Sequence, residues 1–247
     1  MHLVQRRAHE FGVRGVNPDA ITFDLAAAVA RKDAIVQGII AGIYQALRKN
    51  KNIHFFTGHA ELTSPVDLRV DGRRIMAEKT ILAVGSRTAT VTIPGLAEVG
   101  FITNYEALQL ERLPASMIVI GAGYVGVEFA QMYARFGTKV TLLGRAPRVM
   151  PHEDEDISSA LAEVLRADGI DLYTSAPVLR AEREGAEKVV VARVDGEERR
   201  SKAAVILFAS GRVPRIDGLG LEQAGVALER GVIQVDDELR TTAPNIW

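Results

Sequence analysis

An apolar strand that runs directly into a glycine-rich turn and then into a helix is the feature that most constrains this chain. Residues 116–128 read S-M-I-V-I-G-A-G-Y-V-G-V-E. In such a turn Gly121 permits the sharp change of direction, Gly123 leaves the backbone open to a phosphate, and Gly126 lets the helix pack closely on the strand. Unpaired N–H groups and the helix dipole then face the anion. The predicted dinucleotide-phosphate site consists of Gly121, Ala122, Gly123, Tyr124, Val125 and Gly126.

The residues around this turn complete a β-α-β unit. Apolar residues recur at three- and four-residue steps through the predicted helix, at Val125, Phe129, Met132, Tyr133 and Phe136. Gly137 is placed as a helix C-cap, and residues 139–143 have the composition of a second strand. The alternative is an ordinary strand–helix turn that happens to tolerate glycine. The complete context favours the nucleotide site.

Composition narrows the possible partners. The 247 residues carry a formal net charge of −1, with acidic and basic residues interspersed, so we expect small-molecule partners rather than nucleic acid or an anionic membrane. No apolar run is long enough to span a bilayer, and the amino end lacks the apolar core of a signal peptide, which predicts a cytoplasmic location. The five histidines show no metal-ligand spacing, so no metal is assigned. Because the sequence contains no cysteine, it has no redox-active disulfide.

The acidic run at residues 152–156, H-E-D-E-D, has the composition of a metal or acid–base site. It also precedes a predicted helix over 156–167, and acids at a helix start interact favourably with the helix dipole. We interpret the run as the start of that helix.

The chain contains an internal resemblance. Residues 70–87 hold an Asp-Gly turn between two short strands, then an apolar strand that ends in glycine beside a basic residue, and residues 194–212 repeat this order. Before the first copy there is only a long amphipathic helix and a predicted strand at 53–57; the helix face carries Leu25, Val29, Val36, Ile40, Ile43 and Leu47. We therefore expect a fragment, or a truncated relative, of a protein with two tandem dinucleotide-binding domains. The alternative is that two β-meanders merely look alike.

Three ordered motifs carry a family resemblance. They are T-I-L-A-V-G-S-R at 80–87, the glycine loop at 121–128, and G-R-V-P-R at 211–215. Together they resemble the middle of the class I flavin-dependent pyridine nucleotide-disulfide oxidoreductases, the group of dihydrolipoamide dehydrogenase, glutathione reductase and mercuric reductase. The chain departs from the family pattern at Val84, where threonine is usual, and at Arg215, where asparagine is usual.

The resemblance implies parts that this sequence does not contain. Members of this family begin with an FAD-binding glycine loop and a cysteine pair. After the segment that resembles 243–247 they continue into a flavin-binding Gly-Asp, and they end in a dimerisation domain that forms a homodimer. The resemblance thus assigns no catalytic residue here, and this polypeptide alone could not pass hydride to a disulfide.

The type of nicotinamide nucleotide depends on the end of the second strand. NAD sites place an acid about 20 residues beyond the first glycine, whereas this chain has Gly144 and Arg145 there. Arg145 and Arg148 would suit the 2′-phosphate of NADPH, since a guanidinium binds phosphate with paired hydrogen bonds. Alternatively, both arginines simply face solvent at the rim of the loop. Gly126 in place of alanine favours NAD slightly. The missing acid outweighs this, so NADPH is the first expectation and NADH the second.

The resemblance implies further roles. Glu128 would lie near the nicotinamide ribose and amide, although it could be an ordinary first-turn acid, and Tyr124 would cover the flavin until nicotinamide displaces it, although it could serve packing alone. Val178 and Gly211 would line the nucleotide cleft. In a complete enzyme the residues near FAD would be Ala60, Val84, Gly85, Ser86 and Arg212.

These observations predict an α/β fold: a Rossmann-like βαβ nicotinamide-nucleotide domain with a β-meander, inserted in a partial FAD-binding domain of the same type. The predicted boundaries are 1–112 for the partial FAD-binding domain, 113–212 for the NAD(P)-binding domain and 213–247 for the return segment. The expected function is hydride transfer from NAD(P)H to FAD and on to a disulfide or Hg(II). The alternatives are a nucleotide-binding module without catalysis and a flavin-independent dehydrogenase, for which no convincing catalytic set is present.

Overall fold

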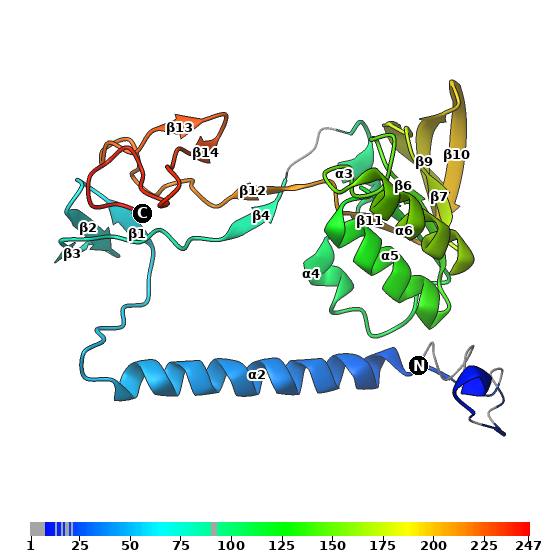
Figure 1. Cartoon of the computed structure of the whole chain (residues 1–247), viewed down its shortest axis with the longest axis horizontal. Coiled ribbons are helices and arrows are strands. Elements are labelled where there is room, and N and C mark those ends of the chain that lie inside the picture. Colours follow the sequence, from blue (N-terminus) through cyan, green and yellow to red (C-terminus); the bar gives the residue numbers. More distant parts are fainter. Residues whose placement is uncertain (1–7, 13, 16, 18–19, 21, 90–92) are drawn as a thin grey trace. The chain divides into compact units, whose positions relative to one another are not determined.

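The computed structural model describes residues 8–12, 14–15, 17, 20, 22–89 and 93–247. They form two compact units (Figure 1). The first contains the described residues of Met1–Ile35 and Thr90–Gly211, and the second contains Val36–Ala89 and Arg212–Trp247. A short 3-10 helix, η1 (Ala8–Phe11), belongs to the first unit, and the long helix α2 (Leu25–Lys49) contributes residues to both. The predicted domains, 1–112, 113–212 and 213–247, remain a prediction.

A parallel sheet forms the centre of the first unit. Its strand order is β11 (Val205–Phe208), β5 (Ser116–Ile120), β6 (Lys139–Leu143) and β7 (Asp171–Tyr173). Successive residues of β5 enter two different cores, Met117 and Val119 one and Ile118 and Ile120 the other. Because both faces of the sheet are covered, its strands read as continuous apolar runs rather than as alternating ones.

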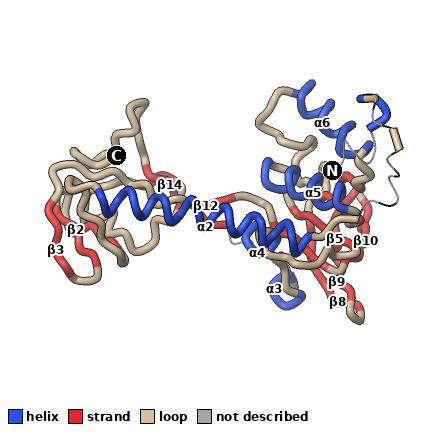
Figure 2. Tube along the Cα trace, turned by 90° about the horizontal axis from the view of Figure 1, so that it is seen from below, coloured by secondary structure: helices blue, strands red, loops and turns tan. Residues whose placement is uncertain are grey.

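Helices cover one face of this sheet (Figures 1 and 2). They are α5 (Tyr124–Phe136) and α6 (Glu155–Ala167), and the single turn α4 (Asn104–Ala107) joins the same core, whereas the single turn α3 (Leu96–Val99) packs in the core on the other face. Tyr133 of α5 is fully buried, and its hydroxyl donates to the carbonyl of Ala107 at 2.6 Å. The β-α-β unit, the Gly137 cap and the helix after the acidic run all form as predicted, although α6 begins at Glu155, one residue earlier than expected.

An antiparallel sheet covers the other face. It consists of β8 (Val178–Glu184), β9 (Glu187–Val194) and β10 (Glu197–Ala203), in the order β10-β9-β8. Val190 and Ala192 of β9 share a core with Ile118 and Ile120 of the parallel sheet. The first unit therefore has three layers, and its α/β class is the predicted one.

The second unit has smaller sheets and a smaller core. Its strands are β1 (Ala60–Leu62), β2 (Asp67–Val70), β3 (Arg73–Met76), β4 (Ser86–Thr88), β12 (Arg212–Pro214), β13 (Leu228–Glu229) and β14 (Val232–Ile233). The β2–β3 turn has positive φ at Asp71 (47°) and Gly72 (84°), and the β9–β10 turn repeats this at Asp195 (52°) and Gly196 (86°). The internal resemblance thus includes the same turn conformation.

The strand predicted at 53–57 does not form. Within the described part of the chain no strand pairs with this segment, and all five residues are exposed. An apolar extended segment becomes a β-strand only when its backbone groups find a ladder partner. The apolar segment at 81–84 likewise has limited pairing, through hydrogen bonds from Thr80 N–H to Asn245 and from Leu82 N–H to Trp247.

Across the described ranges, no helix combines the length and the apolar character that crossing a membrane requires.

Candidate functional site

The glycine loop lies at the carboxyl edge of the parallel sheet, between the end of β5 and the start of α5. Gly121 continues the pairing of the sheet, because its N–H donates to the carbonyl of Leu143 at 2.8 Å. Its φ of 114° is one that side-chain-bearing residues rarely adopt, and an added Cβ would lie 2.6 Å from the carbonyl oxygen of Ala209. Gly121 therefore provides the sharp turn that the sequence predicts.

Gly126 and Gly123 differ in their surroundings. A Cβ on Gly126 would lie 1.8 Å from the carbonyl oxygen of Gly121, so α5 can approach β5 only because this residue has no side chain. A Cβ on Gly123 would meet nothing within 4 Å, and its φ of −84° suits any residue. The space beside Gly123 is thus open, whereas the other two glycines are closely packed.

Gly123 is also the N-cap of α5 and offers no side-chain acceptor to the first N–H groups of the helix. The first turn of a helix leaves N–H groups without intrahelical partners, and the helix dipole adds a partial positive charge there. The open space therefore adjoins backbone donors suited to an anion.

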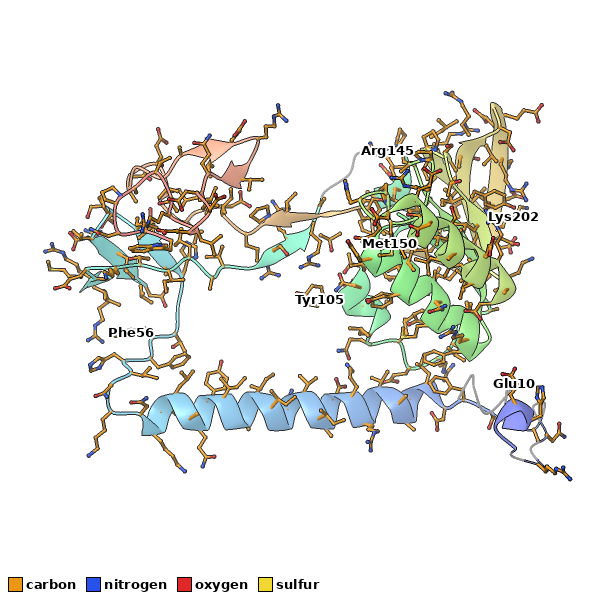
Figure 3. The ribbon with its side chains drawn as sticks, viewed as in Figure 1. Glu10, Phe56, Tyr105, Arg145, Met150 and Lys202 are labelled. Atoms are coloured by element: carbon orange, nitrogen blue, oxygen red, sulfur yellow. The ribbon has the colours of Figure 1, made fainter. Side chains whose placement is uncertain are left out.

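A segment after β6 packs against the loop. The N–H of Met150 donates to the carbonyl of Ala122 at 2.8 Å, and a Cβ on Gly144 would lie 2.8 Å from the Cβ of Ala122. Arg145 and Met150, both labelled in Figure 3, belong to this segment. Gly144 and the glycine loop therefore adjoin each other, as the predicted site requires.

The two arginines predicted at this edge have different environments. Arg145 is exposed. Arg148 is half-buried, and its Nη2 donates to the carbonyls of Pro151 and Glu153 at 3.4 and 3.5 Å. Its Nε is buried and forms no hydrogen bond within the described residues. Arg148 thus forms hydrogen bonds within this segment, whereas the side chain of Arg145 is exposed.

Tyr124 and Glu128 occupy the first turns of α5, and both are exposed. The Tyr124 hydroxyl donates to the carboxylate of Glu153, and this hydrogen bond raises the pKa of the phenol above its usual value. This pair could not be predicted from the sequence, because nothing in the acidic run distinguishes Glu153 from its neighbours. Asp154 is the N-cap of α6, and Glu155 and Asp156 lie in its first turn.

Val178 and Gly211, which were predicted to line the nucleotide cleft, also belong to the first unit. Val178 begins β8 and is half-buried, and it packs against the core between the two sheets. Gly211 is exposed, with a φ of 102°, and follows β11. The order of the parallel strands places Gly211 at the carboxyl edge that also carries Gly121 and Gly144. The role of both residues in lining a cleft remains a prediction.

The residues predicted near FAD belong to the second unit. Arg212 donates from Nε to the hydroxyl of Ser86 at 2.8 Å and from Nη2 to the Ser86 carbonyl at 2.7 Å, which joins β12 to β4. Gly85 precedes this pair, and its carbonyl accepts from Arg215 N–H at 3.1 Å. Val84 is half-buried beside it, and Ala60 lies in β1, opposite Val70. The structure therefore brings Gly85, Ser86 and Arg212 together.

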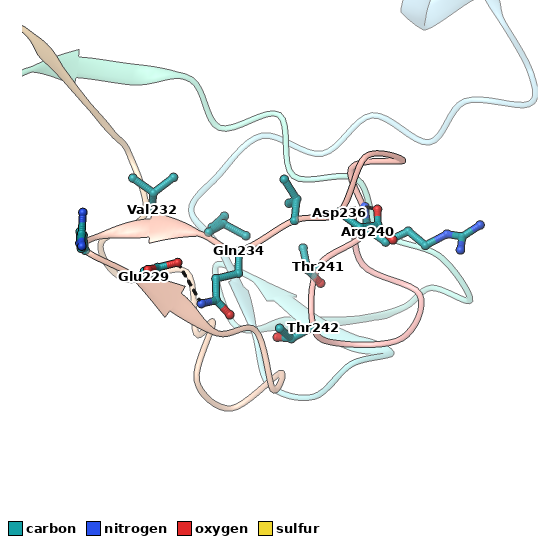
Figure 4. Close-up of a pocket in the computed structure, with 10 residues that line it drawn as sticks. Glu229, Val232, Gln234, Asp236, Arg240, Thr241 and Thr242 are labelled. Carbon is teal, nitrogen blue, oxygen red and sulfur yellow. Dashed lines mark hydrogen bonds between the residues drawn. The ribbon is translucent and has the colours of Figure 1, made fainter.

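A shallow cavity of about 800 Å³ was not expected from the sequence. It lies in the second unit beside the β13–β14 hairpin, where Gln234 donates to Glu229 at 3.4 Å (Figure 4). Its lining residues include Arg230, Asp236 and Arg240. The mixture of both charge signs on an open surface indicates no particular ligand.

Comparison with known proteins places this geometry in a family. Residues 3–247 match the family described as pyridine nucleotide-disulphide oxidoreductase. The chain is 33% identical over 234 residues to the mercuric reductase of Bacillus cereus. The aligned residues make up 94% of this chain and 37% of that protein. It is also 31% identical over 246 residues to the dihydrolipoyl dehydrogenase of Bacillus subtilis (strain 168). These aligned residues make up 98% of this chain and 53% of that protein.

The solved structure of the HOCl-induced flavoprotein disulfide reductase RclA from Escherichia coli is also similar. The TM-score is 0.82 at 32% sequence identity, over 100% of this chain and 55% of that one. The chain thus spans about half the length of this relative and of the dihydrolipoyl dehydrogenase. Because the match to the family covers nearly every residue, the chain belongs to the pyridine nucleotide-disulphide oxidoreductase family.

Proposed function

We propose that the first unit binds NADPH, and NADH more weakly, as the nicotinamide-nucleotide site of a flavoprotein oxidoreductase. Family membership supports the general class, since the relatives named above are reductases and dehydrogenases. In a complete protein of this kind, hydride from NAD(P)H would be transferred to FAD and the electrons passed on to a disulfide or to Hg(II). The proposed location is the cytoplasm, and the proposed partner is a small-molecule nucleotide. A homodimer stays a prediction for the complete protein.

The single observation that carries the proposal is the open space beside Gly123 between two closely packed glycines. Backbone donors at the start of α5 would hold the diphosphate, and the exposed Arg145 would bind the 2′-phosphate. Glu128 would face the nicotinamide ribose and amide. In this arrangement the chain positions the nucleotide and supplies electrostatic stabilisation, while the redox chemistry belongs to the cofactors.

The test is a titration of the purified chain with NADPH, followed by nucleotide fluorescence, for the wild type and Gly123→Asp. Aspartate is a good N-cap and would meet no neighbour here, so the fold should persist. Its carboxylate would occupy the anion position, and we expect affinity to fall at least about tenfold, which is ~1.4 kcal/mol. Gly42→Asp is the matched control, because it adds the same charge at an open position of α2 whose backbone accepts a side chain. A wild type that does not bind, or equal binding by Gly123→Asp, would contradict the proposal.

A second candidate function is a nucleotide-binding module without catalysis. It is favoured by the absence of cysteine from the sequence, since no disulfide within these residues can accept electrons from a reduced flavin. The two candidates differ in whether added FAD is reduced. We expect the chain to be colourless when purified and to bind NADPH; oxidation of NADPH after addition of FAD supports the oxidoreductase, and its absence supports the module.

A further inference from the structure

Arg199 of β10 differs from the charged residues on either side of it. Glu198 and Arg200 each bind a partner of opposite charge across β9. Arg199 is exposed, and across the described ranges it forms no ion pair and no hydrogen bond. Its guanidinium instead lies over the ring of Tyr173, 4.3 Å from the ring centroid. A cation whose N–H donors are all free is thus held against an aromatic ring.

The register of the antiparallel sheet explains why Arg199 points away from its neighbours. Arg199 lies opposite Ala192 of β9, and Ala192 lies opposite Val178 of β8. Residues that lie opposite each other in such a sheet have their side chains on the same face. Because Ala192 and Val178 pack in the core between the two sheets, Arg199 belongs to this inner face. It therefore shares a row with Val178, which is predicted to line the nucleotide cleft.

Tyr173 connects this row to the carboxyl edge of the parallel sheet. It is the last residue of β7, and its side chain packs against the same core. Its carbonyl accepts from the N–H of Gly144 at 2.8 Å, and the N–H of Ser175 donates to the carbonyl of Ala146 at 2.8 Å. Hydrogen bonds on both sides of Arg145 therefore fix the backbone of that residue beside Tyr173.

We propose that Arg199 is a specificity-determining residue, which binds the 2′-phosphate of NADPH together with Arg145. The inference rests on the proposed function, because it adds a residue to the same nucleotide site. A phosphate monoester carries about two negative charges near neutral pH and has three acceptor oxygens. One guanidinium binds two of these oxygens, which leaves charge and an acceptor for a second guanidinium. Since the ring of Tyr173 already restrains Arg199, binding costs little side-chain entropy.

The test compares Arg199→Met with the wild type by titration with NADPH and with NADH. Methionine keeps an aliphatic side chain over Tyr173 and removes the charge, so the fold should persist. We expect the dissociation constant of NADPH to rise about tenfold, because a charge-assisted contact is lost, and that of NADH to change by less than about twofold.

The matched control is Arg193→Met. Arg193 is exposed on β9 and lies opposite Glu198, so this variant removes the same charge from the outer face of the same sheet. An unchanged ratio of NADPH to NADH affinity in Arg199→Met, or an equal shift of the ratio in Arg193→Met, overturns the inference. A wild type that binds neither nucleotide contradicts the proposed function instead, and with it this inference.

Two fragments of the nucleotide locate the effect. Adenosine 2′,5′-bisphosphate carries the 2′-phosphate and no nicotinamide, and adenosine 5′-monophosphate lacks the 2′-phosphate. We expect Arg199→Met to weaken binding of the bisphosphate about tenfold and to leave binding of the monophosphate nearly unchanged. An equal loss for both fragments would place Arg199 against another part of the nucleotide and would overturn the inference.

A further variant tests the role of the ring. Tyr173→Leu removes the aromatic face and keeps an apolar side chain against the core. We expect NADPH to bind about threefold more weakly, as loss of a cation–π contact predicts, and NADH to bind as before. Combined with Arg199→Met, this change should add no further loss, because the ring acts through Arg199. Additive losses in the double variant would show that the two residues act separately and would overturn the arrangement.

Discussion

Gly126 and Gly123 show how a single motif contains residues of two kinds. Gly126→Ala would place a Cβ 1.8 Å from a backbone carbonyl, which cannot move without shifting β5. We expect this change to lower the free energy of unfolding by about 1–3 kcal/mol, as overpacked sites do. Gly123→Ala meets open space and should be close to neutral. Chemical denaturation of both variants checks this, and equal stabilities would contradict the described packing.

Arg145 determines the nucleotide preference in our proposal. Because Arg145 is exposed beside Gly144, a change to glutamate would repel a 2′-phosphate and could accept hydrogen bonds from a ribose. We expect Arg145→Glu to shift the ratio of NADPH to NADH affinity toward NADH by about tenfold or more, which is ~1.4 kcal/mol. Titration with both nucleotides measures the ratio.

The control for this change is Arg112→Glu, which alters the charge equally at an exposed position before β5, at the amino end of that strand. An unchanged ratio in Arg145→Glu, or the same shift in Arg112→Glu, would remove the basis for preferring NADPH.

At the scale of elements, β8 and β10 carry a ladder of charges across β9. Glu182 accepts from Arg180 at 2.8 Å and from Arg200 at 3.2 Å, and Arg180 also binds Glu198 at 2.9 Å. Glu184 binds Arg200 and Lys202, the latter labelled in Figure 3. Val189 and Val191 of β9 face the same side and are fully buried. The aliphatic stems of the charged residues therefore shield a second apolar surface.

This ladder predicts a dependence of stability on pH. Hydrogen bonds from Arg180 lower the pKa values of Glu182 and Glu198 in the folded state, and hydrogen bonds from Lys202 and Arg200 lower that of Glu184. A lowered pKa contributes stability above the unfolded-state value, near 4.5, and this stability is lost as the pH falls through the folded-state value. The triple change to glutamine should flatten the fall in stability below about pH 4.5. Denaturation at several pH values checks this, and an identical pH profile would contradict it.

The elements also show what could be predicted from the sequence. The β-α-β unit was predictable because local signals agreed: glycine spacing, an apolar helix face and a capping glycine all point to one structure. The prediction of a strand at 53–57 was wrong. The segment has the composition of a strand, but strand formation depends on a pairing partner that no local pattern encodes. The hydrogen bond between Tyr124 and Glu153 was likewise not predictable from the sequence, since it depends on how the segment after β6 folds back on the loop.

At the scale of the whole molecule, the two units have cores of different size. The described residues of the first form two clusters, one on each face of the parallel sheet, which contain the fully buried Tyr133, Ile118 and Leu142. The second has a single cluster of smaller extent, which includes Leu62, Ala224 and Ile246. Apolar burial is the main favourable term in folding, so the second unit has less to offset the entropy of ordering its backbone.

Hydrogen exchange should therefore differ between the units. We expect the slowest amides in β5, β6 and β11 and faster exchange in β1, β2 and β3. A ligand that binds only the folded first unit, at a concentration of about 100 times its dissociation constant, adds about 2.7 kcal/mol to the stability of what it binds. NADPH should accordingly slow the globally exchanging amides of the first unit about a hundredfold and leave β1–β3 nearly unchanged. Equal protection of both units would mean that they unfold together and that the nucleotide stabilises the chain as one cooperative body.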